Sequence, residues 1–148
     1  MSEKDIYNIY KDVTAIVGTE NVLADEPMSR HTTFRIGGKA DCFVKPRSAE
    51  EVADLISLCR ERKIPYFILG NGSNLLVSDD GYRGMIINIM DNMDTVTVDG
   101  RTITAQAGAM LVRVSAAARD NSLTGLEFAS GIPGTIGLSL IHISEPTR

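Results

Sequence analysis

One segment restricts the possible folds more than any other: two short apolar runs joined by a helix. The run 40–45 reads as a strand, and 66–69 (Tyr-Phe-Ile-Leu) is a continuous apolar strand of the kind buried on both faces of a parallel sheet. Between them, Ser48 and Glu51 form a capping box that begins an amphipathic helix. Residues 40–69 therefore predict a β-α-β unit with a right-handed crossover.

The rest of the chain predicts an α+β fold, with antiparallel strands after the small parallel sheet. The segment 27–33 reads as extended or loop. Asp99-Gly100 lies between two alternating segments and is a strong hairpin signal. The further elements predicted are helices over 3–17 and 111–118, a strand over 84–90, and a hairpin of 94–98 with 102–107.

The composition excludes several classes of function. The chain has 148 residues, the length of one ordinary domain, and 43% of them are hydrophobic. A net charge of −4, with 5% aromatic residues and no tryptophan, argues against a nucleic-acid surface. The sequence has neither a signal-peptide core nor an apolar run long enough to span a membrane. We therefore expect a cytoplasmic protein with no nucleic-acid or membrane partner.

The cysteine and histidine residues do not form a metal-binding pattern. Cys42 and Cys59 are far apart, His31 is isolated, and His142 lies in a divergent C-terminal tail. Cys59 falls on the apolar stripe of the predicted helix. We expect two buried free thiols and no metal.

A glycine-rich loop, Gly-Asn-Gly-Ser-Asn at 70–74, follows the strand 66–69. These residues tolerate positive φ and leave the carboxyl end of a strand, where open α/β sheets bind ligands. Successive N–H groups could form a nest for a pyrophosphate, with Ser73 and Asn74 adding donors. A tight turn is the simpler interpretation, and these residues alone favour it. The dinucleotide fingerprint and the P-loop are excluded, because Leu75 replaces a third glycine and no lysine is present.

A second glycine-rich loop, Ala-Ser-Gly-Ile-Pro-Gly-Thr-Ile-Gly, covers 129–137. Exposed N–H groups and small hydroxyls, stiffened by Pro133, would let a ligand approach closely. The alternative is a helix C-terminus followed by a turn. Because one chain contains two donor-rich loops, we interpret them as opposite walls of one site for a phosphate-bearing cofactor.

Three segments, in order and in register, resemble one enzyme family. HTTFRIGGKAD (31–41), ILGNGSNLLV (68–77) and FASGIPGTIG (128–137) closely resemble UDP-N-acetylenolpyruvoylglucosamine reductase, also called UDP-N-acetylmuramate dehydrogenase. This is the FAD-dependent enzyme of bacterial peptidoglycan (cell wall) precursor synthesis. The resemblance implies a two-lobed vanillyl-alcohol-oxidase-type (PCMH-type) FAD-binding domain over 22–137, with its second lobe truncated. A helix and lead-in over 1–21 precede it.

The resemblance also implies which residues hold FAD, by matching the motifs. From the first loop these are Gly70, Asn71, Gly72, Ser73, Asn74 and Leu75; from the second, Gly131, Ile132, Pro133, Gly134, Thr135 and Gly137. Thr33, Arg35, Ile36 and Gly37 belong to the first matching motif, with a role as much structural as cofactor-contacting; for Arg35 a surface ion pair is an equal alternative. The sequence has no flavin-linking histidine beside the first loop, so the flavin is expected to be non-covalent.

The reaction implied has two hydride transfers: from NADPH to the flavin, then from the flavin to the enolpyruvyl group of UDP-N-acetylglucosamine enolpyruvate. The family's catalytic serine, arginine and glutamate lie in segments after Gly137, so no catalytic residue is assigned in this chain. A monomer is implied for the full-length protein. Residues 1–148 alone are expected to bind FAD weakly or not at all and to lack reductase activity.

Residues 138–148, LSLIHISEPTR, depart from the family pattern. They resemble the in-frame translation of a transposase adapter used in preparing sequencing libraries, so we expect a foreign tail. A natural truncation with a diverged tail is the alternative. Two other functions stay open: another PCMH-type flavin oxidoreductase, such as a sugar or hydroxy-acid oxidase, and a non-catalytic nucleotide-binding module that ends near 137.

Overall fold

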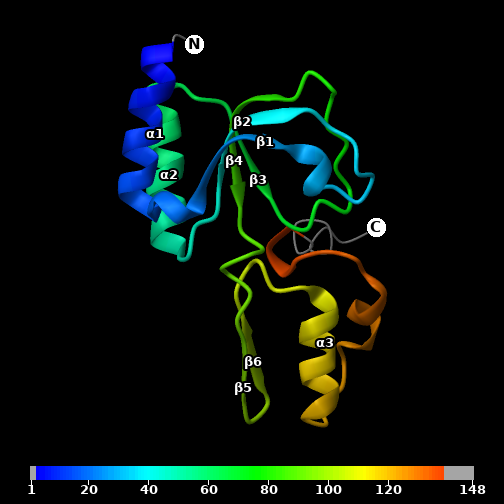
Figure 1. The fold of residues 1–148 in the computed structure, drawn as a ribbon. Coiled ribbons are helices and arrows are strands. Elements are labelled where there is room, and N and C mark those ends of the chain that lie inside the picture. The colour runs from blue at the N-terminus through cyan, green and yellow to red at the C-terminus, as the bar shows by residue number, and fades with distance from the viewer. Residues whose placement is uncertain (1–2, 139–148) are drawn as a thin grey trace, which may run out of the picture. The chain divides into compact units, whose positions relative to one another are not determined.

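A computed structural model describes residues 3–138, with side chains from residue 9 onward. The chain divides into two compact units, Met1–Asn88 and Ile89–Arg148 (Figure 1). Of the predicted foreign tail, 138–148, only Leu138 is described; His142 and the other residues of the tail lie outside the described residues. Each unit is described by itself below.

The first unit contains a four-stranded sheet in the order β1-β2-β4-β3. The strands are β1 (Val22–Pro27), β2 (Lys39–Val44), β3 (Tyr66–Leu69) and β4 (Tyr82–Asn88). β1 pairs antiparallel with β2, whereas β2 and β3 both pair parallel with β4. The predicted β-α-β unit is confirmed, with β4 lying between its two strands.

Three details of this sheet differ from the prediction. β3 lies at an edge and Phe67 is 42% exposed, so burial of this strand on both faces was wrong. An apolar run does not show how many neighbours a strand has. The strand predicted at 84–90 runs from Tyr82 to Asn88. β1 was not predicted, because the polar residues Asp25 and Glu26 interrupt its apolar pattern.

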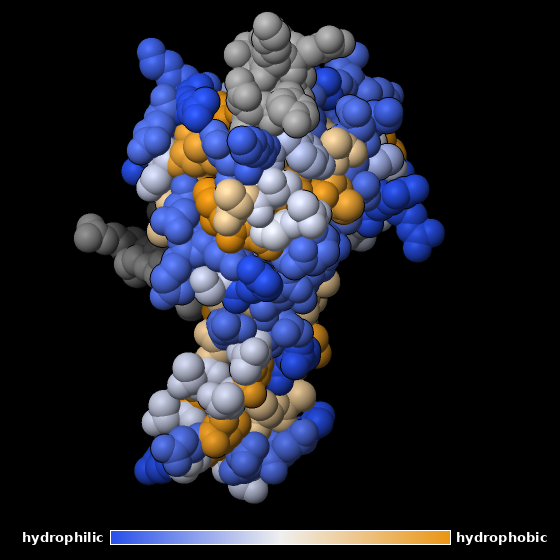
Figure 2. Space-filling view, turned by 60° about the vertical axis from the view of Figure 1, so that its left-hand side comes forward, coloured by the Kyte–Doolittle hydropathy of each residue, from blue (hydrophilic) through white to orange (hydrophobic). Residues whose placement is uncertain are grey.

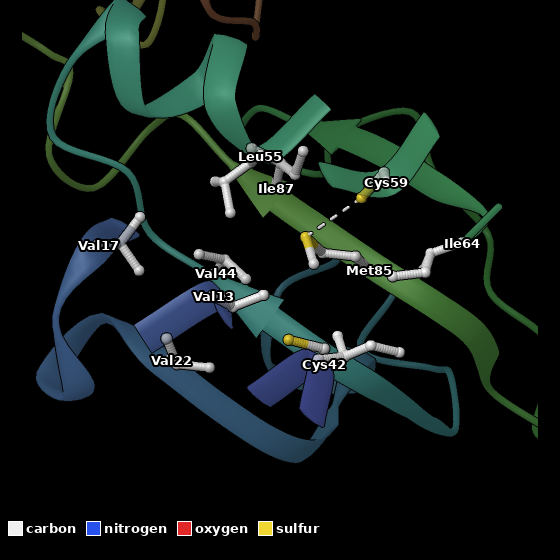
Figure 3. Packing of buried hydrophobic residues seen from close by; sticks show 11 residues of the cluster. Val13, Val17, Val22, Cys42, Val44, Leu55, Cys59, Ile64, Met85 and Ile87 are labelled. Atoms are coloured by element: carbon white, nitrogen blue, oxygen red, sulfur yellow. Dashed lines mark hydrogen bonds between the residues drawn. The ribbon is translucent and has the colours of Figure 1, made fainter. Parts of the chain in front are cut away.

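Two helices, α1 (Glu3–Val17) and α2 (Ala49–Arg62), cover one face of the sheet (Figures 1 and 3). Ser48 caps the N-terminus of α2: its Oγ accepts the N–H of Glu51 at 3.2 Å, as the capping box predicts. The Glu51 carboxylate instead accepts the N–H of Arg47, at 2.7 Å. The helices and the covered face of the sheet enclose a first core cluster. Its buried residues are Ile9, Val13, Val17, Val22, Cys42, Val44, Leu55, Cys59, Ile64, Met85 and Ile87.

A second core cluster of the first unit supports the first glycine-rich loop. Side chains alternate along a strand, so Phe43 belongs to this cluster while its neighbours Cys42 and Val44 belong to the helix-covered one. The buried members are Met28, Ala40, Phe43, Leu69 and Ile86, with Leu75 and Val77 packed against them. The strand end that leads into the loop and the segment after it are therefore anchored in the same core.

The second unit holds the predicted hairpin and helix. β5 (Val96–Asp99) and β6 (Thr102–Ala105) pair antiparallel around Gly100, whose φ is +56°. The strands are shorter than predicted. α3 (Leu111–Asp120) is followed by a 3-10 helix, η3 (Glu127–Gly131), which includes the first residues of the second glycine-rich loop, 129–131.

The two thiols, Cys42 and Cys59, are free and buried, as predicted. Among the residues described, no group of three or more His, Cys, Asp and Glu residues could hold a metal ion. None of the helices in the described part of the chain is long and apolar enough to cross a bilayer.

Candidate cofactor site

The first two motifs meet in the first unit. The loop 70–74 begins where β3 ends, and it lies against the segment after β1. The N–H of Thr33 donates to the carbonyl oxygen of Gly72 at 3.1 Å. Farther along, the N–H of Gly38 donates to the carbonyl oxygen of Ser78 at 2.9 Å. Backbone hydrogen bonds therefore join the first motif to the loop and to the residue that follows the second motif.

Gly72 has a conformation and a contact that only glycine allows. Its φ is +64°, and a Cβ at this position would lie 1.9 Å from the carbonyl oxygen of His31. The side-chain oxygen of Asn71 accepts the N–H of Ser73 at 3.3 Å, which closes a local turn within the loop. The loop is thus a tight turn with a left-handed residue, and this is also the geometry from which anion-binding nests are built.

The candidate residues of this loop differ in exposure. Gly70 and Gly72 are buried, Asn71, Ser73 and Leu75 are half-buried, and Asn74 is exposed. Asn74 is therefore the loop side chain most available to a ligand.

Residues of the first motif shape a turn beside this loop. Thr32 Oγ1 donates to the carbonyl oxygen of Ile36 at 3.0 Å, and the N–H of Arg35, whose φ is +55°, donates to the carbonyl oxygen of Thr32 at 3.1 Å. Gly37 has a φ of +132°, and a Cβ there would lie 2.8 Å from Cβ of Val77. Within the described residues Arg35 has no ion-pair partner. These contacts give the motif a structural role.

Large apolar side chains lie exposed in the same two motifs. Phe34 is 59% exposed, Ile36 50% and Leu76 70%. The face shown in Figure 2 also carries small apolar patches among hydrophilic residues. Exposed apolar side chains therefore accompany the loop in both motifs.

The second loop belongs to the second unit, where its backbone pairs with the segment before α3. The N–H of Leu111 donates to the carbonyl oxygen of Gly134 at 2.9 Å. The N–H groups of Ile136 and Gly137 donate to the carbonyl oxygens of Ala109 and Ala107, each at 2.8 Å. These amides are engaged within the unit, whereas the sequence predicted exposed N–H groups. Amides that bond within the chain are not available as ligand donors.

An open groove of about 550 Å³ lies between α3 and the segment 122–130. It meets the second loop region only at Ser130. Ser115 and Ser130 line it, but their hydroxyls donate to the carbonyl oxygens of Leu126 and Glu127, at 3.0 and 2.7 Å. The groove therefore reaches the second loop only at the start of that loop.

Comparison with known proteins assigns the family. The profile of a family described as FAD binding domain matches residues 40–142, which is more than half of the chain. This chain belongs to the FAD-binding-domain family. The UDP-N-acetylenolpyruvoylglucosamine reductase of Alkaliphilus metalliredigens is 44% identical over 133 residues, which cover 90% of this chain and 44% of that protein. The chain thus spans less than half the length of the curated relatives it matches.

Solved structures support the fold of this FAD-binding domain. The UDP-N-acetylenolpyruvylglucosamine reductase of Thermus caldophilus is 32% identical with a TM-score of 0.58, covering 76% of this chain and 38% of that one. A p-cresol methylhydroxylase is 17% identical with a TM-score of 0.63, covering 83% of this chain and 26% of that one. The chain therefore has the predicted PCMH-type α+β fold and represents only part of the full domain.

Two residues of the second loop fit a bound FAD. Thr135 is 1% exposed, and its Oγ1 is a buried side-chain oxygen with no hydrogen-bond partner in the described part of the chain. Gly131 has no left-handed φ, and a Cβ there would meet nothing within 4 Å. The unit itself therefore does not require a glycine at 131. Close approach of a ligand would require one.

Gly137 has a different constraint. A Cβ on Gly137 would lie 2.8 Å from Cβ of Ala107, so internal packing explains this glycine. Ile132 and Pro133 are half-buried and exposed, respectively, in the turn before Gly134.

Sequence reasoning missed two contacts of this FAD-binding domain. The carbonyl group of His31 supports Gly72, and Ala107 and Ala109 pair with the second loop. His31 belongs to the first motif, but Gly72, which it contacts, lies some forty positions away in the chain. No local signal marks the two alanines.

Proposed function

We propose that this chain is the FAD-binding part of a UDP-N-acetylenolpyruvoylglucosamine reductase. The enzyme would use NADPH to convert UDP-N-acetylglucosamine enolpyruvate to UDP-N-acetylmuramate in the cytoplasm, for peptidoglycan precursor synthesis. The observation that carries this proposal is the 44% identity over 133 residues with the Alkaliphilus reductase. The full-length protein would act as a monomer on these small-molecule substrates.

The first loop would hold the pyrophosphate of a non-covalently bound FAD. Its left-handed Gly72 and the Asn71–Ser73 turn curve the backbone so that N–H groups other than that of Ser73, which donates to Asn71, can face one side. The exposed amide of Asn74 adds a donor at that side. Leu75 packs against the core below the loop and would limit its motion.

The second loop would also contribute contacts to FAD. Gly131 offers a backbone surface without a side chain, and Thr135 holds a hydroxyl with no internal partner. When bound, FAD accepts a hydride and passes it on. The chain's own residues would bind and orient it, and we assign no catalytic acid or base to them.

Another flavin oxidoreductase of the same fold is the second candidate. The TM-score with p-cresol methylhydroxylase, 0.63, exceeds that with the Thermus reductase, 0.58. The identity of 32% with the reductase, against 17%, favours the reductase. A turnover assay of the full-length protein, with a UDP-sugar substrate and with a phenolic substrate, would separate the two candidates.

Titrating the ¹⁵N-labelled chain with FAD tests the cofactor assignment. We expect weak binding that shifts the amide resonances of 70–74 and of Gly131, because these residues form the proposed contacts. The chain alone should not oxidise NADPH with the UDP-sugar substrate. The full-length protein, whose coding sequence is obtained by sequencing the source gene through the codon for Gly137, should oxidise NADPH with the UDP-sugar substrate. Unchanged amides of 70–74 and Gly131 when FAD binds to the full-length protein would refute the assignment, and NADPH oxidation by the 148-residue chain would refute its dependence on further residues.

A further inference from the structure

His31 is fixed by three different contacts in the first unit. Its ring Nε2 lies 2.9 Å from Oε1 of Glu26, and its backbone N–H donates to the carbonyl oxygen of Met28 at 2.9 Å. Its ring stacks on Phe43, with the ring centroids 4.1 Å apart and the planes inclined by 28°. Phe43 is fully buried in the sheet core. The imidazole is therefore held at its edge and on its face.

The backbone of the same residue meets the first glycine-rich loop. The His31 carbonyl oxygen occupies the space where a Cβ of Gly72 would lie, 1.9 Å away. Two residues on, the Thr33 N–H binds the Gly72 carbonyl oxygen. The position of the His31 peptide therefore limits the position of Gly72.

The contact between the side chains of His31 and Glu26 is largely buried. The side chain of Glu26 is only 12% exposed and that of His31 only 18%, so both polar groups have lost most of their water. Arg30 lies 3.6 Å from the same Glu26 oxygen, but its side chain is 70% exposed. The Glu26–His31 contact, rather than the Arg30 pair, is the buried one.

We propose that His31 is a positioning residue for the FAD-binding loop: Glu26 and Phe43 fix its ring, and its carbonyl group sets the backbone of Gly72. This inference rests on the proposed FAD-binding function. Loop amides can bind phosphate well only if they are held in place before the ligand arrives. The side chain of His31 would then control the affinity of the loop for FAD through the backbone contact between His31 and Gly72.

The test compares His31→Leu with Arg30→Ala in the ¹⁵N-labelled chain. His31→Leu removes the hydrogen bond to Glu26 and the ring stack, so the amide resonances of 70–74 should move even without FAD. Its FAD dissociation constant should rise about fivefold, the effect of losing one buried hydrogen bond. Arg30→Ala changes only the exposed neighbour and should leave both measurements unchanged. Glu26→Gln keeps an oxygen acceptor for His31 and should retain most of the affinity.

The outcomes separate the inference from the proposed function. Unmoved loop amides or unchanged FAD affinity in a folded His31→Leu chain would overturn the role of His31 alone. If the wild-type chain does not bind FAD, the affinities are compared in the full-length protein, and the proposed function fails if that protein does not bind FAD either. If His31→Leu does not fold, Glu26→Ala supplies the same comparison, because it removes the ring's partner and leaves the stack on Phe43.

Discussion

The sulfur atoms of Cys59 and Met85 lie 3.6 Å apart in the core beneath α1 and α2 (Figure 3). Cys42, on β2, belongs to the same cluster. Burial raises the pKa of Cys42 to about 12, with smaller contributions from Cys59 and Asp41, and burial raises the pKa of Cys59 to about 11. Both thiols are therefore held in their neutral form in the folded chain.

The first prediction concerns stability at alkaline pH. Because the folded-state pKa values exceed the usual value of 9.0, the thiols' contribution is fully present below pH 9. It is lost as the pH rises from 9 toward 11 and 12, since the unfolded chain releases these protons first. Urea unfolding at several pH values should show the free energy of unfolding falling over this range. A Cys42→Ala/Cys59→Ala chain should show a smaller fall, and equal falls would contradict the prediction.

The second prediction concerns the buried hydroxyl of Thr135. Replacing it with the isosteric valine removes a polar atom that has no partner within the described residues, so Thr135→Val should raise the free energy of unfolding by about 1 kcal/mol. The same change should weaken FAD binding if the hydroxyl contacts the cofactor. Thermal unfolding and FAD titration measure the two effects. Destabilisation by valine would show that the hydroxyl has a partner in solution.

Features that depend on neighbours in the sequence were predicted well. The apolar tetrad 66–69 became β3, and Ser48 became an N-cap. The hairpin was located correctly, but its turn is Gly100-Arg101, one residue later than the predicted Asp99-Gly100, because Asp99 pairs with Thr102. In each case the backbone conformation is set by adjacent residues, through turn chemistry or alternation. The glycine-rich loop 70–74 was also located correctly, although which ligand it takes is not readable from its backbone.

Features that depend on distant residues could not be predicted. The exposure of Phe67 follows from β3 being an edge strand, and this depends on where β4 inserts. In the second loop, the N–H groups of Ile136 and Gly137 donate to the carbonyl oxygens of Ala109 and Ala107. These two alanines belong to no motif that includes the loop. Local sequence contains no information about such a pairing, so the loop was expected to expose donors that the fold uses internally.

The third prediction uses Gly131, where the chain has room for a side chain. A Cβ would meet nothing within 4 Å and φ is not left-handed, so Gly131→Ala should leave the free energy of unfolding within about 0.5 kcal/mol of wild type. Its FAD affinity should fall several-fold, because the added methyl group would occupy the space that the cofactor approaches. Equal FAD affinity would remove Gly131 from the site. Destabilisation would instead show that the glycine is needed for folding.

The fourth prediction uses Gly72 as the structural counterpart of Gly131. Gly72→Ala places a Cβ 1.9 Å from the His31 carbonyl oxygen at a φ of +64°, and neither backbone can move without shifting the hydrogen bond from Thr33. We expect a loss of about 3 kcal/mol in the free energy of unfolding, from strain and overpacking together. Urea unfolding of the two glycine variants side by side measures the difference. A Gly72→Ala chain as stable as wild type would show that the loop does not rest on His31, and it would also weaken the case for His31 as a positioning residue.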